Sequence, residues 1–153
     1  MLLFFLSLVL SRDESFCGES IKLHKRNRLF ISIALLYGLL GGLIALTRLI
    51  EPALLPGNVP RAHGHIMLLG FFMMFIYGVG LHVLPRFSGF PLYSERMANW
   101  QLYIANAGLP VMVAGWLSWV NWLVTIGGLL TYAAMGLFAV NMLLTVKSKG
   151  PGR

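Results

Sequence analysis

Four long apolar stretches separated by short polar segments dominate this chain of 153 residues. Each stretch has about the 20 residues that an α-helix needs to cross the hydrocarbon core of a bilayer. The pattern predicts membrane-spanning helices over residues 29–49, 63–84, 99–119 and 122–146. We therefore expect an all-α, polytopic membrane protein with a single transmembrane domain, residues 29–146.

The segments between the predicted spans carry residues that interrupt helices. Residues 50–62 contain three prolines, which forbid a continuous helix between the first two spans. Residues 85–98 are expected to join the second and third spans. A tight turn at residues 120–121 should make the third and fourth spans antiparallel neighbours. Pro110 lies inside the third span, where we expect a kink.

The two ends of the chain differ from the spans. Residues 1–28 are expected to form an N-terminal arm, apolar over its first ten residues and then polar, ending in a basic run. Ten apolar residues are about half of a span, and no basic residue precedes them, so an extended or interfacial arm is favoured over a signal peptide. Residues 147–153 form a short basic tail.

Composition and charge agree with a membrane protein and predict its orientation. Hydrophobic residues make up 58% of the chain, charged residues 11%, and the mean hydropathy is +0.77. The net charge of +7 does not indicate a nucleic-acid partner, because the basic residues flank apolar spans. Lys and Arg are enriched in cytoplasmic loops of membrane proteins. A cytoplasmic N-terminus places ten of the twelve Lys and Arg residues inside and only Arg48 and Arg61 outside. Both termini are therefore expected in the cytoplasm, with the protein in a membrane of the bacterial inner-membrane type.

Two residue types limit the chemistry and the packing. The single cysteine, Cys17, excludes an internal disulfide, a thiolate cluster and a covalent CxxCH haem attachment. Glycines recur at helical spacing, which favours close contact between helices. The pairs are Gly38 with Gly42, Gly108 with Gly115, and Gly128 with Gly136.

The second span contains the residues with the clearest chemistry. His63 and His65 open it, His82 lies near its end, and no charged residue stands between His63 and Pro85. An unpaired polar ring in hydrocarbon costs free energy, and imidazole is a common ligand for haem iron and copper. This pattern predicts a haem or metal site, with His63 as the first candidate ligand and His65 and His82 as further ones.

The spacing of the histidines limits how they can act together. His63 and His82 are 19 residues apart, or about 28 Å along a helix, so they cannot share one iron. His65 is about 200° from His63 around the helix, so the two cannot grip one metal from the same face. A second ligand for an iron at His63 would be a methionine or a histidine from another subunit, unless the position stays open. Each histidine could instead cap a helix or hydrogen-bond a carbonyl group.

The second span also resembles the second helix of the haem–copper oxidase superfamily, which includes cytochrome c oxidase subunit I, nitric oxide reductases and NnrS-type proteins. His63 matches the early histidine that ligates a low-spin haem, and residues 83–86 (Val-Leu-Pro-Arg) match the end of that helix. The remaining matches to the NnrS-type pattern are His65, Gly70, Ile76, Gly78 and Pro85. The resemblance covers about 26 residues.

This resemblance implies a b-type haem held non-covalently by His63 near the outer side of the membrane. It also implies that the haem propionates lie on the side where Arg48 and Arg61 are expected. Met67, Phe71 and Met74 follow His63 at helical spacing, so they are candidates for the wall of a porphyrin pocket. Copper is a second candidate metal.

The superfamily has about twelve spans in three arcs of four, and this chain resembles one arc. A complete haem–copper active site is excluded within one chain, because the third and fourth predicted spans contain no histidine. We expect a homo-oligomer, a trimer ahead of a dimer, or association with larger redox subunits.

The expected function is electron transfer or the binding or reaction of a diatomic gas, NO or O2. Whether the protein is catalytic stays open. One alternative is a non-catalytic accessory subunit of a larger respiratory membrane complex. A second is a metal or small-solute carrier, with His63 and His65 at the entry and His82 at the exit.

Overall fold

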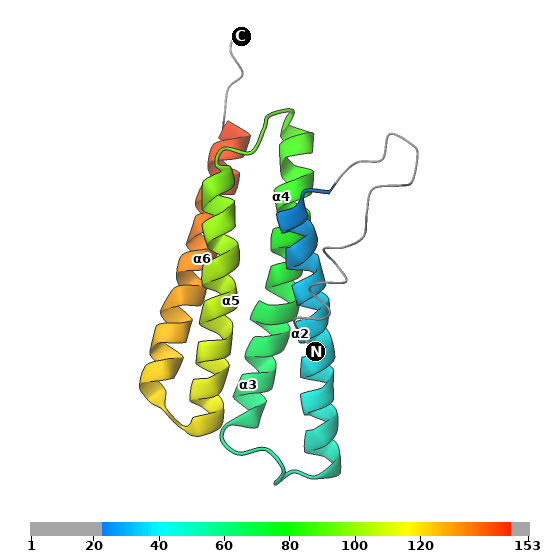
Figure 1. Cartoon of the computed structure of the whole chain (residues 1–153), viewed down its shortest axis with the longest axis vertical. Coiled ribbons are helices and arrows are strands. Elements are labelled where there is room, and N and C mark those ends of the chain that lie inside the picture. Colours follow the sequence, from blue (N-terminus) through cyan, green and yellow to red (C-terminus); the bar gives the residue numbers. More distant parts are fainter. Residues whose placement is uncertain (1–22, 148–153) are drawn as a thin grey trace.

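The computed structural model describes residues 23–147, which fold into helices joined by short loops. The helices are α2 (Lys25–Ile50), α3 (Val59–His65), the π-helix η1 (Ile66–Met73), α4 (Met74–Ser88), α5 (Glu95–Ser118) and α6 (Asn121–Lys147). The segments α3, η1 and α4 follow one another without a break and form one helix of 30 residues, here called the second span (Figure 1). The described residues contain no strand, so the all-α prediction is confirmed. The predicted arm up to residue 22, with Cys17, and the tail from residue 148 lie outside the described residues.

Within residues 23–147, three helices are long and apolar enough to cross a membrane: α2, the second span and α6. This indicates an integral membrane protein. Helix α5 has the necessary length, 24 residues, but it is more polar, with Gln101 and Asn106 in its middle. Three spans are therefore supported by length and composition.

The helices are arranged as two antiparallel pairs (Figure 1). Helix α2 packs against the second span, and α5 packs against α6 after a turn at Trp119 and Val120. The predicted antiparallel packing of the last two helices is thus confirmed. The loop of residues 51–58 and the α5–α6 turn lie at one end of the bundle, here called the loop end. The start of α2 and the end of α6 lie at the other, the terminal end.

Helix ends are set by side chains that satisfy free backbone groups. The Asn58 side chain accepts the backbone N–H of Arg61, so the second span begins at Val59, four residues before the predicted start. The second span also runs through Pro85 to Ser88 and ends at Gly89, whose φ is +72°. The prediction that the linker starts at Pro85 is therefore wrong. Within the last turn this proline removes only one intrahelical hydrogen bond.

Glycines bring the helices close together, but not always the predicted ones. Gly108 and Gly115 do face α6, where an added Cβ would lie 2.9 Å from the Thr131 N atom and 2.6 Å from the Val124 N atom respectively. On the other two helices the prediction is confirmed only in part, because Gly38 contacts Phe71, whereas an added Cβ at Gly136 would meet nothing within 4 Å. Gly41, not Gly42, contacts Met67, and Gly127, not Gly128, contacts α5.

Polar contacts fasten the terminal end. Arg26 is only 5% exposed, and its guanidinium pairs with Glu95 and donates to Asn99 Oδ1 at 3.1 Å. The basic run that ends the predicted arm therefore contains a buried link between α2 and α5, and α2 starts at Lys25, inside the predicted arm. On α6, the Asn141 side chain accepts the Ser94 N–H and donates to the Ser94 carbonyl, at 3.0 and 2.9 Å. These bonds hold the start of α5 against the end of α6.

Gln101 on α5 is a fully buried polar residue whose side chain is not hydrogen-bonded. Its side chain is 0% exposed, yet neither its amide nitrogen nor its amide oxygen has a hydrogen-bond partner. A buried polar group without a partner costs free energy. We expect Gln101→Leu to raise the free energy of unfolding by about 1–3 kcal/mol. Thermal unfolding of the detergent-solubilised protein checks this, and a lower melting temperature would show that Gln101 is hydrogen-bonded, for example to internal water.

Candidate functional site

His63 lies in α3 at the loop end and turns toward α2. Its ring is half-buried, and its Nδ1 atom lies 3.0 Å from the Gly41 carbonyl oxygen. A carbonyl oxygen can only accept a hydrogen bond, so Nδ1 carries the proton and donates. In the neutral ring Nε2 then has a free lone pair. Protein ligands to metals commonly show this arrangement, because the second hydrogen bond fixes the tautomer and the ring orientation.

His65 turns toward a different helix. Its Nδ1 atom donates to the Arg61 carbonyl oxygen at 2.7 Å, and its ring centroid lies 5.8 Å from that of Trp116 on α5. His63 contacts α2, whereas His65 contacts α5. The predicted separation of the two rings around the helix is confirmed, and they do not form a joint metal site.

A π-helix follows the histidine pair directly. Residues 66–73 form the i→i+5 hydrogen bonds of η1, inside a span that is otherwise α-helical. Such segments are rare and are frequent at functional sites. The π-helix also changes which residues share a face, because each of its turns holds more residues than an α-turn.

The residues of the predicted porphyrin wall do not share one face of the second span, because the π-helix changes the register of this part of the helix. Met67 packs against Gly41 and Phe71 against Gly38, so both lie between the second span and α2. Met74 is 1% exposed and belongs to the core shared with α5 and α6. The prediction that Met74 lies on the face of His63 is therefore wrong, and the space beside Met67 and Phe71 is filled by α2.

The two arginines of the loop end also separate. The Arg48 guanidinium donates to the Pro52 carbonyl oxygen within its own loop. The Arg61 guanidinium lies over the Trp116 ring, 4.9 Å from its centroid. Arg61 is thus on the side of His65, not of His63, and the expected pair of propionate-binding arginines is not assembled within one subunit.

The remaining histidines are distant from this region along the chain. His82 is half-buried on α4, toward the terminal end. His24 is the N-cap of α2, where its Nδ1 accepts the Arg26 N–H at 3.3 Å. Within residues 23–147, no group of three His, Cys, Asp or Glu side chains is placed to hold a metal ion.

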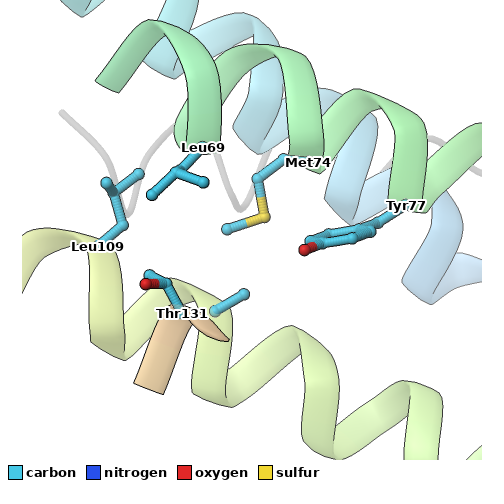
Figure 2. Close-up of a pocket in the computed structure, with 6 residues that line it drawn as sticks. Leu69, Met74, Tyr77, Leu109 and Thr131 are labelled. Atoms are coloured by element: carbon cyan, nitrogen blue, oxygen red, sulfur yellow. The ribbon is translucent and has the colours of Figure 1, made fainter. Parts of the chain in front are cut away.

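A small cavity lies deeper in the bundle, between the second span and the α5–α6 pair (Figure 2). Its volume is about 10 Å³, which is room for roughly one water molecule. Leu69, Met74 and Tyr77 line one side, and Leu109 and Thr131 line the other. A porphyrin does not fit there.

The residues therefore fit a haem in part. His63 offers a correctly protonated axial ligand, but the helices that flank it are in contact with each other and leave no porphyrin slot at Met67. A haem on His63 would have to lie on the outside of these helices. No family model, curated protein or solved structure matches this chain.

Three features of the described structure were missed from the sequence. They are Trp116, which contacts both Arg61 and His65, the buried Arg26, and the π-helix. The Trp116 position has a weak signal, since tryptophan is enriched at membrane interfaces. The π-helix has no sequence signal that we recognise.

Proposed function

We propose that this protein is an integral membrane protein that binds b-type haem non-covalently through Nε2 of His63, at a boundary between subunits. The observation that carries the proposal is the hydrogen bond from His63 Nδ1 to the Gly41 carbonyl oxygen, which leaves Nε2 free as a ligand. When bound, the haem would supply one-electron transfer or the binding of a diatomic gas such as NO or O2.

The surface around His63 supports an approach from outside the subunit. Gly64, next to His63, and Gly42, next to its hydrogen-bond partner, would have no atom within 4 Å of an added Cβ. Both are exposed. Small residues let a second helix or a flat ligand come close. A homo-oligomer, with a trimer ahead of a dimer, would place a second apolar wall there.

We further propose that α5 is a fourth membrane span. It runs antiparallel to α6 along its whole length, from Ser94 beside Asn141 to Gly115 beside Val124. If α6 crosses the bilayer, α5 crosses with it. Exposed aromatic residues at both ends agree with interfacial belts: Tyr93 and Trp100 at the terminal end, Trp119 and Trp122 at the loop end.

The visible absorption spectrum of the purified protein tests the haem proposal. We expect a Soret band and, after reduction, an α-band at the position of a b-type haem. Supplying haem during expression removes cofactor shortage as an explanation for a colourless product. A colourless protein under those conditions would contradict the proposal.

A colourless protein would favour the second candidate function, a non-catalytic subunit that packs beside larger redox subunits. The observation that favours it is that both His63 and His65 are hydrogen-bonded to backbone carbonyl groups, as structural histidines are. Helix α2 also exposes a row of leucines that a partner helix could cover as well as lipid can, among them Leu39, Leu43 and Leu46. The carrier alternative stays a prediction.

We infer the orientation of the protein in the membrane from the charges at the two ends of the bundle. The terminal end carries five basic residues near helix ends: Lys25, Arg28, Arg86, Arg96 and Lys147. The loop end carries two, Arg48 and Arg61. We expect the terminal end in the cytoplasm. Cysteines introduced singly at Arg153 and at Ala53, in a Cys17→Ser background, should react with a membrane-impermeant maleimide from opposite sides. External labelling at residue 153 would reverse the orientation.

A further inference from the structure

Arg61, His65 and Trp116 form a cluster at the loop end that the haem proposal does not use. The guanidinium carbon of Arg61 lies over the indole, 4.9 Å from the ring centroid, and the imidazole of His65 lies beside the same indole. Arg61 is exposed, while Trp116 is half-buried on α5. A cation and two aromatic rings from two different helices therefore meet at the level of the exposed Trp119 and Trp122.

Backbone contacts hold this cluster in place. The Asn58 N–H donates to the Trp116 carbonyl oxygen at 2.8 Å, and Gly57, with φ +79°, lies directly against Leu117. A side chain at Gly57 would overlap the Leu117 carbonyl group. The loop before the second span is thus attached to the end of α5. Arg61 lies in the first turn of the second span and reaches Trp116 from there.

The cluster has hydrogen-bond donors without acceptors. The buried Nε1 atom of Trp116 has no partner, and a buried donor left unpaired costs free energy. Arg61 has no carboxylate within salt-bridge distance among residues 23–147. The guanidinium is a cation and a hydrogen-bond donor without an acceptor. Both side chains therefore lack an acceptor, and a negatively charged oxygen would satisfy the indole N–H and also balance the charge of Arg61.

We propose that this cluster binds the phosphate of an anionic membrane phospholipid. A pair of phosphate oxygens would match the guanidinium of Arg61, and a further oxygen would supply the acceptor that the Trp116 N–H lacks. The chemistry would suit a free phosphate ion as well. The position at the membrane interface, among exposed tryptophans, favours the lipid.

Native mass spectrometry of the purified protein with added lipid tests the site, whether or not haem is present. Phosphatidylglycerol is the probe, and the zwitterionic phosphatidylcholine is the comparison lipid. We expect Arg61→Gln to weaken phosphatidylglycerol retention roughly ten-fold, the effect of losing one charge-assisted bidentate contact. Trp116→Phe keeps the ring under Arg61 but removes the N–H, so a smaller loss is expected.

Arg48→Gln is the matched control, because Arg48 is the other loop-end arginine and is engaged by its own loop. It should retain phosphatidylglycerol as the wild type does. Equal retention by the wild type and Arg61→Gln would overturn the site, and equal retention of both lipids by the wild type would overturn its preference for an anionic phospholipid. Displacement of the lipid by excess inorganic phosphate would assign the site to the free ion and overturn the lipid.

Discussion

Replacing Gly127 with leucine should separate α5 from α6 and destabilise the protein more than any other glycine substitution in α6. An added Cβ at Gly127 would lie 2.6 Å from both the Gly108 carbonyl oxygen and the Met112 Cα, and it would also overlap the Met112 backbone nitrogen. These are backbone atoms, which cannot turn aside as a side chain can. The expected cost is about 3 kcal/mol or more in the free energy of unfolding.

Gly136→Leu provides the matched control on the same helix. A Cβ at Gly136 would meet no atom within 4 Å, and the residue is exposed. This variant should melt at or above the wild-type temperature, because leucine has a higher helix propensity than glycine. If both variants melted at the same temperature, the close approach of α5 and α6 at Gly127 would be wrong.

Replacing His63 with alanine should remove haem from the purified protein. The substitution deletes the proposed ligand atom, Nε2, and only one hydrogen bond to Gly41, worth about 1 kcal/mol. The helix should still insert, because a small apolar residue replaces a polar one. The ratio of Soret absorbance to protein concentration measures the loss, and the melting temperature shows whether the fold persists.

Two further histidine variants make this result specific. His24→Ala changes the N-cap of α2 at the terminal end and should leave the haem content unchanged. His65→Ala alters the ring beside Trp116, on the other face of the second span. Loss of haem only in His65→Ala would move the ligand to that face, and unchanged haem in His63→Ala would end the assignment to His63.

The positions of the helices could be predicted from the sequence, because long apolar stretches leave few alternatives in a bilayer. The sequence could not predict which glycine contacts the neighbouring helix. Gly127 and Gly128 are adjacent and chemically identical, and the rotation of α6 against α5 decides between them. That rotation depends on the summed packing of many side chains, so local sequence contains no signal for it.

The candidate site shows the same division. The divergence of His63 and His65 followed from helical geometry and is confirmed. The grouping of Met74 with Met67 failed, because it assumed an unbroken α-helix across η1. The burial of Arg26 was missed because its partners, Glu95 and Asn99, lie about 70 positions later in the chain.

The π-helix has a consequence for how the second span can change. Residues after it, such as Tyr77 and Leu81, are locked in the core, while the histidine pair before it points to the helices beside it. One residue corresponds to about 100° of rotation in an α-helix. Losing or gaining a single residue within η1 would turn both imidazoles by that angle, and with them the buried Val59 and Ala62. The number of residues in η1 therefore sets the direction of the two histidines and the packing of the start of the span together.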